Sequence, residues 1–167
     1  SCYDRVSGRT PKVRRSTESS WNVREEFSEI TDQKNVFLTV RSTEPISCNW
    51  GRSPERIRLL VRCVENTSAI VFSTHCHMTS SEYNDYGHVD VRLDDDRATV
   101  WRMRASTNNR ALGLWSGRRS IPQIRRMFGK NRLTARMTPF NENAFVVNFD
   151  ITGLEDAIAP MREACNW

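Results

Sequence analysis

The chain has 167 residues, 38% of them hydrophobic, which suits one folded domain with a substantial core. No apolar run approaches the roughly 20 residues that cross a bilayer, so we predict no transmembrane segment. The chain begins at Ser1 without a signal-peptide pattern, as expected if an export signal has been removed. The net charge is +5, and 22 of the 25 basic residues are arginine. Arginine suits bidentate contacts to phosphate or carboxylate, although the same bias can reflect genome base composition.

The chain opens with a polar segment that lacks periodicity. Residues 1–20 carry Gly, Pro and five basic residues, which is typical of a flexible lead-in. From Trp21 the pattern becomes that of strands: residues 21–30 alternate loosely, and residues 36–40 are β-branched and aromatic. We therefore predict a hairpin here, and a single β-rich domain over residues 21–167.

A second hairpin is predicted from two apolar runs, residues 57–64 and 69–76, on either side of the sequence ENTS. An antiparallel register through a four-residue turn places Cys63 opposite Ile70 and Ile57 opposite Cys76. The predicted core face carries Ile57, Leu59, Val61, Cys63, Ile70 and Phe72. The opposite face, at least partly wet, carries Arg58 and Arg62.

Residues 88–94 alternate as a strand, and residues 98–104 return after the sequence DDDR. We considered calcium at Asp94, Asp95 and Asp96, but the run lacks the alternating carboxylate spacing of an EF-hand. A solvated turn is the interpretation that this pattern favours. Residues 111–115 predict one more short strand.

The last third of the chain combines two strands with two short helices. Ser120 is the expected N-cap of a helix over residues 121–128 that buries Ile121, Ile124 and Phe128 and ends at Gly129. Residues 132–138 and 144–151 follow as the last strand pair.

The chain ends in a predicted amphipathic helix. Thr152 and Glu155 have capping-box spacing, which starts this helix at about Gly153, and Pro160 should kink it. Its apolar stripe carries Leu154, Ile158, Met161 and Cys165. The elements together predict a mainly β fold: an antiparallel β-sandwich or curled sheet of about eight strands with two short α-helices.

Five cysteines stand at positions 2, 48, 63, 76 and 165, and no two form a CxxC pair. Neither a zinc ribbon nor a thioredoxin-type redox site has its expected spacing, so a disulfide-bearing exported protein is favoured over a reduced cytosolic one. Because the count is odd, one thiol remains unpaired, and we expect it to be Cys2.

The strongest surface signal is a basic stretch over residues 118–132 without an acidic residue. We name it the helix patch, and its members are Arg118, Arg119, Arg125, Arg126, Lys130 and Arg132. The interpretation without a binding function is a solvated helix face. The functional one is an anionic partner such as a lipid headgroup, a cell-wall polymer or an acidic protein surface. Nucleic acid is the least expected partner, because no recognition motif accompanies the charge.

No catalytic or metal site is predicted, and no cofactor. His75, Cys76 and His77 could ligate copper or zinc, but in a strand the two imidazoles share one face while the thiol points to the other. His88 and Asp90 share a strand face, yet no serine motif such as GxSxG accompanies them.

Several fragments carry a family resemblance: RCVENTS (62–68), VDVRLDDDRATVWRMRAST (89–107) and FDITGLEDAIAPMREACNW (149–167), with CYDRVSG at the start. In this order they resemble the VasI/TagO (EvfG) family of type VI secretion-associated proteins. The most specific elements are Arg-Cys at 62–63 and the terminal Gly-Leu, Ala-Ile and Cys-x-Trp. Residues 46–51 and 78–87 match poorly, so Cys48 and Cys76 look like an addition.

The resemblance implies an exported, periplasmic, non-enzymatic accessory protein that binds another envelope or secretion-system protein. The family pattern and the core-face positions meet at Cys63 and Cys165, where a disulfide would staple the C-terminal helix onto the sheet, leaving Cys48 and Cys76 as the second pair. Five cysteines permit fifteen two-bridge arrangements, and Cys63 and Cys165 could also be small buried hydrophobes. The alternative function is a periplasmic module that binds an anionic glycan or lipid headgroup through the helix patch.

Overall fold

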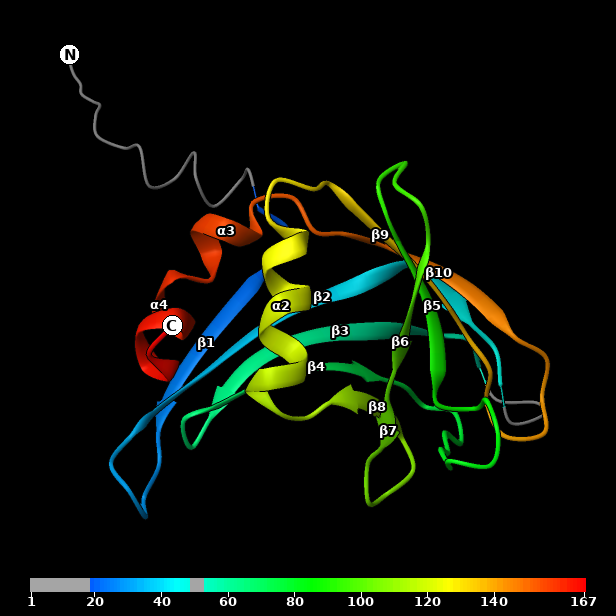
Figure 1. Ribbon diagram of the computed structural model, residues 1–167, viewed down its shortest axis with the longest axis horizontal. Coiled ribbons are helices and arrows are strands. Elements are labelled where there is room, and N and C mark those ends of the chain that lie inside the picture. The colour runs from blue at the N-terminus through cyan, green and yellow to red at the C-terminus, as the bar shows by residue number, and fades with distance from the viewer. Residues whose placement is uncertain (1–18, 49–52) are drawn as a thin grey trace.

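A computed structural model describes residues 19–48 and 53–167. Ten strands form an antiparallel sheet in the order β6-β5-β9-β10-β2-β3-β4-β8-β7, with β1 paired to β2 beside this path (Figure 1). The strands are β1 (Asn22–Phe27), β2 (Lys34–Ile46), β3 (Glu55–Val64), β4 (Thr67–Ser73), β5 (His88–Leu93), β6 (Thr99–Arg102), β7 (Arg104–Ala105), β8 (Ala111–Leu114), β9 (Arg132–Met137) and β10 (Phe145–Asp150). The described helices are α2 (Gly117–Met127), α3 (Leu154–Ala157) and α4 (Ala159–Cys165). The mainly β, curled-sheet prediction is confirmed, with ten strands instead of about eight and three short helices instead of two.

The sheet nearly closes on itself because its two edges are consecutive in the chain. β6 is one end of the strand order and β7 the other, yet only Met103 separates them. The Met103 N–H donates to the Gly87 carbonyl at 2.8 Å, and a Cβ on Gly87 would collide with the Met103 carbonyl oxygen. The return strand predicted over 98–104 exists, but it divides between the two edges.

The β3–β4 hairpin has the predicted faces but not the predicted register. Its turn consists of Glu65 and Asn66 alone, both with positive φ (49° and 62°), so Cys63 lies opposite Ser68 instead of Ile70. The prediction was wrong because it assigned four residues to the turn, whereas a two-residue turn with two positive φ angles matches strand twist better. The shift is by two residues, so every side chain keeps its face.

β2 changes partner along its length. β1 pairs with its first half, Lys34 to Thr39, and a register shift against β3 falls between Arg41 and Pro45. Beyond the first half, β10 pairs with the same strand at only one position, Phe149 opposite Ser42.

A polar contact reinforces this short junction between β2 and β10. The Glu44 carboxylate accepts the main-chain N–H of Asn148 at 2.9 Å and its side-chain amide at 2.8 Å. Partial burial raises the pKa of Glu44, but the hydrogen bonds from Asn148, together with those from Thr43 and the Glu44 main chain, outweigh it and hold that pKa below its ordinary value. We call this contact the Glu44 junction.

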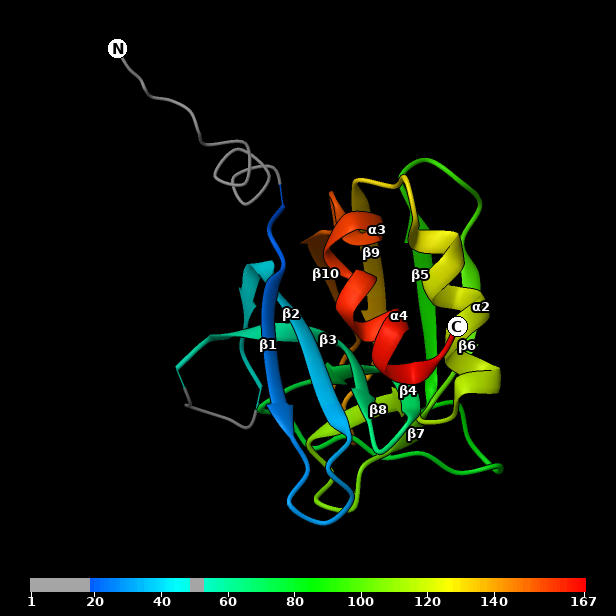
Figure 2. The same cartoon turned by 90° about the vertical axis from the view of Figure 1, so that its left-hand side faces the viewer.

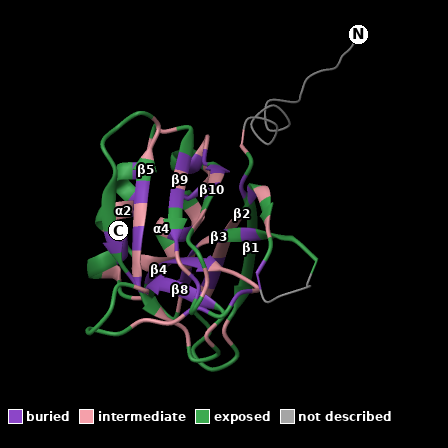
Figure 3. Ribbon diagram, turned by 90° about the vertical axis from the view of Figure 1, so that its right-hand side faces the viewer, coloured by how far each residue is buried: buried purple, intermediate pink, exposed green. Residues whose placement is uncertain are grey.

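The core fills the concave side of the curled sheet. Buried residues alternate along β3, whereas β4 is buried on both faces, and Figure 3 shows the buried stretches of the sheet. Figure 2 shows α3 and α4 between β1 on one side and α2 on the other. Leu154, Ile158 and Met161 are fully buried, so the predicted apolar stripe packs as expected. The kink at Pro160 is also present: the chain forms two helices that meet at Ile158.

Two predicted helix caps are wrong. Gly153, with φ 82°, precedes α3 in the left-handed region, and no side chain caps the helix, so Thr152 and Glu155 form no capping box. α2 begins earlier than predicted, with Ser116 as N-cap. Ser120 is instead buried inside the helix, where its hydroxyl donates to the Ser68 carbonyl at 2.7 Å. Tertiary burial thus competed successfully with a local capping preference.

The end of α2 is close to the predicted one. Gly129, with φ 77°, follows the C-cap Phe128. Ile124 is buried as predicted, whereas Ile121 and Phe128 are only half-buried and Met127 takes the second core position.

No helix in the described part of the chain is long and apolar enough to cross a membrane. Most of the predicted lead-in over residues 1–20, including Cys2, lies outside the described residues.

Candidate functional site

A disulfide between Cys63 and Cys165 joins β3 to α4, with the two Cα atoms 5.9 Å apart. The cysteines are 102 residues apart in the chain, and the Cys63 side chain is fully buried on the core face of its strand. The bridge therefore holds the C-terminal helix on the sheet.

Trp167 packs beside this bridge, where its indole contacts one hydroxyl and two guanidinium groups. Its indole N–H donates to the Ser68 hydroxyl at 2.9 Å. The guanidinium groups of Arg125 and Arg162 lie 5.2 Å and 4.9 Å from the indole centroid, and the Arg162 Nε donates to the main-chain oxygen of Trp167. The terminal Cys-x-Trp thus holds α4 against α2 and β4.

Cys48 and Cys76 form the second disulfide, with Cα atoms 5.6 Å apart. It fastens the segment after β2 to the segment after β4, and the His75 Nε2 bonds to the Ile46 carbonyl at 2.8 Å beside it. The potential ligand atoms of Cys48, His75 and Cys76 lie within 4.8 Å of one another, but both sulfurs are engaged in the bridge.

Contrary to the prediction, His75 and His77 do not share a strand face, because β4 ends at Ser73 and both residues follow it. The two rings have different neighbours: His75 bonds to the Ile46 carbonyl, whereas His77 packs at a tilt against Phe140 with ring centroids 5.4 Å apart.

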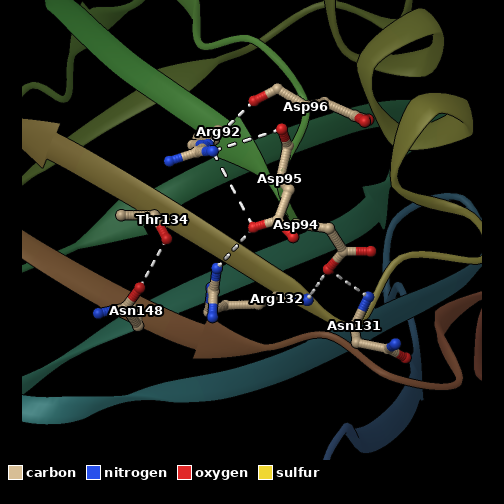
Figure 4. Close-up of polar contacts among 8 residues, drawn as sticks. All are labelled: Arg92, Asp94, Asp95, Asp96, Asn131, Arg132, Thr134 and Asn148. Carbon is tan, nitrogen blue, oxygen red and sulfur yellow. Dashed lines mark hydrogen bonds and ion pairs between the residues drawn. The ribbon is translucent and has the colours of Figure 1, made fainter.

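The structure divides the helix patch into engaged and open cations. Lys130 pairs with Asp96 at 2.8 Å. Arg132 lies 3.7 Å from Asp95 (Figure 4). Arg125 covers Trp167, as described above, and Arg119 donates to the Arg102 carbonyl at 3.2 Å. The remaining two members, Arg118 and Arg126, are exposed on α2.

The Asp94–Asp96 turn therefore does more than face solvent. The Asp94 carboxylate accepts the main-chain N–H groups of Asn131 and Arg132 at 3.0 and 2.9 Å (Figure 4). Asp96 raises the pKa of Lys130 by hydrogen bonding and by its charge. The turn fixes the connection between α2 and β9 and neutralises part of the helix patch.

A second arginine surface lies on the outer face of the sheet, where β1, β2 and β3 run side by side. It is a groove of about 720 Å³ that we name the sheet groove. It is lined by Ser20, Asn22, Arg24, Phe37, Thr39, Val40, Arg41, Arg58, Leu60 and Ser73. All three ionisable side chains in this lining are arginines.

Strand register places the groove arginines. Arg41 of β2 is directly opposite Arg58 of β3, so two guanidinium groups project side by side from one face. Arg24 of β1 is opposite Phe37 of β2, and its guanidinium carbon lies 4.4 Å from the ring centroid. Within residues 19–48 and 53–167, neither Arg41 nor Arg58 has an ion-pair partner.

An aromatic and apolar platform continues the groove toward β8. Arg62, the other cross-strand neighbour of Phe37, lies 5.4 Å from the Trp115 ring, and burial lowers the pKa of its guanidinium. The Trp115 indole lies so close over Gly113 that a Cβ there would be 2.6 Å from the ring. The platform beneath consists of Ala69, Val71, Ala111 and Leu60.

Only part of this surface is predictable from the sequence. Arg58 and Arg62 lie on the wetter face of their strand, as predicted. Arg24 and Arg41 were not predicted as part of a site, because they belong to other strands and nothing local links them to Arg58. The available signal was alternation: Phe37, Thr39 and Arg41 occupy the positions between buried Val36, Leu38 and Val40.

These features define a class of protein: a mainly β, disulfide-stabilised domain with a cationic groove on the outer face of its sheet. The chain belongs to the type VI secretion system VasI, EvfG family, whose family model matches residues 1–167. This confirms the resemblance, and it associates the chain with type VI secretion. No curated protein and no solved structure matches the chain.

Proposed function

We propose that this chain is an exported accessory protein of type VI secretion that works in the bacterial periplasm. In this proposal it acts as an adaptor that binds another envelope or secretion-system protein, and not as an enzyme. Family membership supports the association with secretion. The two disulfides support an oxidising compartment, because disulfides persist there and are rare in the reducing cytosol.

The observation that carries the adaptor proposal is the sheet groove. Arginine and aromatic side chains dominate the energetics of protein interfaces, and here they alternate across three strands. Arg41 and Arg58 also stand opposite each other without a described acidic partner, an arrangement that favours occupation by a partner's negative charge.

The proposal is tested by complementation of a strain that lacks the gene. We expect the wild-type chain to restore export of a type VI substrate to the medium, and the double variant R41E/R58E to fail. The matched control R97E/R102E reverses two exposed arginines outside the groove and should restore export.

Periplasmic fractionation with non-reducing peptide mapping checks location and disulfides. Free thiols at Cys63 and Cys165 in native material would contradict the proposal.

A second candidate function is binding of an anionic glycan or lipid headgroup through the helix patch. Its support is that α2 carries four arginines and no acidic residue. It predicts binding of phosphatidylglycerol vesicles that weakens steeply with salt and disappears in R118E/R126E, which reverses the two open cations of the patch. Binding of a protein partner that is lost in R41E/R58E but not on reversal of the helix patch would favour the adaptor function instead.

A further inference from the structure

We propose that the sheet groove binds an extended acidic segment of the partner protein. In that segment two carboxylate side chains stand four residues apart, with an apolar side chain midway. This inference rests on the adaptor function proposed above and names the chemistry of the partner.

Charge complementarity supplies the first argument. Like charges directly opposite in an antiparallel pair destabilise the sheet, and Arg41 and Arg58 are such a pair. A carboxylate placed between the two guanidinium groups would accept hydrogen bonds from both and remove this repulsion. The groove lining contains three arginines and no acidic residue, so an acidic ligand meets no opposing charge from it.

The spacing of the arginines also fits an extended peptide. Arg24 is level with Phe37, and Arg41 lies four residues further along β2. At about 3.3 Å per residue, the two ends of the groove are about 13 Å apart. In an extended peptide, residues four apart have the same spacing and point to the same side, so two such carboxylates reach both ends.

The lining between the arginines supplies the third argument. Phe37 and Leu60 are half-buried. The cross-strand pair Thr39–Leu60 lies between Phe37 and the arginine pair Arg41–Arg58. An apolar side chain midway along the ligand would cover this surface. A compact phosphate or headgroup would reach one end of the groove only, which favours a peptide chain.

One internal contact must yield to the ligand. Arg24 bonds to Glu26 at 2.7 Å, and both side chains are more than half exposed, at 61% and 51%. Exposed ion pairs contribute little to stability, so a ligand carboxylate can replace Glu26 at low cost.

The probe is a blocked synthetic peptide with two aspartates four positions apart, a leucine midway, and serine and threonine elsewhere. Titration calorimetry or amide chemical shifts with the full chain measure its affinity. Two control peptides carry asparagines in place of the aspartates, or aspartates three positions apart, so that one points away. We expect each control to bind at least about tenfold more weakly.

Protein variants locate the binding. R41E/R58E should lose measurable affinity, whereas R97E/R102E, with the same change in charge, should bind as the wild type does. If R41E/R58E does not fold, as judged by circular dichroism, R41Q/R58Q replaces it, with an expected loss of about tenfold.

Three results would overturn the inference. The control peptides could bind as tightly as the probe, or the groove variant could retain wild-type affinity. Alternatively, phosphatidylglycerol vesicles or inorganic phosphate could bind at the groove while the probe does not. If R41E/R58E abolishes export but the probe does not bind, the adaptor function stands and only the peptide chemistry fails. If R41E/R58E supports normal export, the adaptor function itself fails.

Discussion

The helix patch and the sheet groove are both rich in arginine, but they use it differently. In the helix patch, Lys130 and Arg132 pair with aspartates, and Arg125 covers Trp167. In the sheet groove, Arg41 and Arg58 face each other without a described counter-charge. A continuous basic run in the sequence has thus become largely structural, whereas arginines scattered over three strands form the open cationic site. We therefore predict that changes at engaged residues cost stability, whereas changes at the open arginines of the groove cost binding.

The largest expected effect on stability comes from removing the Cys63–Cys165 disulfide, which holds α4 and Trp167 beside the helix patch. C63A/C165A should lower the free energy of unfolding by up to about 4 to 5 kcal/mol, because a long loop is no longer closed in the unfolded chain. C48A/C76A is the matched control: its cysteines are only 28 residues apart, so the loss should be smaller, up to about 3.5 kcal/mol. Denaturant unfolding measures both, and a larger loss in the control would contradict the prediction.

The next effect concerns the Glu44 junction, which supports β2 just beyond Arg41. E44Q should cost about 1 to 2 kcal/mol, because the hydrogen bonds to Asn148 lose their charged acceptor.

The same contact has a pH dependence with a defined sign. The pKa of Glu44 is lower in the folded chain than its ordinary value. Its stabilising contribution is therefore complete above the ordinary glutamate pKa of about 4.3, and it is lost as the pH falls through the depressed folded-state pKa. Unfolding curves of wild type and E44Q should converge in acid; a constant difference down to that range would refute this account.

A smaller effect separates two neighbouring arginines of the helix patch. R125Q should lower stability by about 0.5 to 1 kcal/mol, because the cation over Trp167 is lost. R126Q is exposed on the same helix and should change stability by less than about 0.5 kcal/mol. Thermal unfolding of the pair makes the comparison, and equal values would show that Arg125 has no structural role.

The smallest effect has the opposite sign. R58T removes one member of the opposed arginine pair and adds a β-branched residue to a strand, so it should raise stability by a few tenths of a kcal/mol. The same variant should weaken binding of the acidic peptide. A variant that is less stable than wild type would show that Arg58 has a structural role.

Most strands were predictable because alternation of apolar and polar residues is a local property. The β9–β10 pair and the core face of β3 follow directly from it. Errors arose where two local interpretations competed. The sequence ENTS could form a turn of four residues or of two, and Ser120 could cap a helix or be buried within it.

The candidate site was less predictable than the fold. Arg58 was placed on the correct face, but the sheet groove requires that β1, β2 and β3 be neighbours in a particular register. The helix patch was visible as a run of basic residues, yet the engagement of its last two members depends on a turn more than 30 residues earlier in the chain.

The sequence alone determined the fold class, the faces of the strands and the family, because each depends on short-range periodicity or on motifs that are contiguous in the chain. The tertiary structure alone decided which of the described arginines are engaged and which lack a described counter-charge, and that the two edges of the sheet meet at Met103. The physical reason is that charge pairing and sheet closure depend on distances between residues far apart in the chain, and strand order and register set those distances.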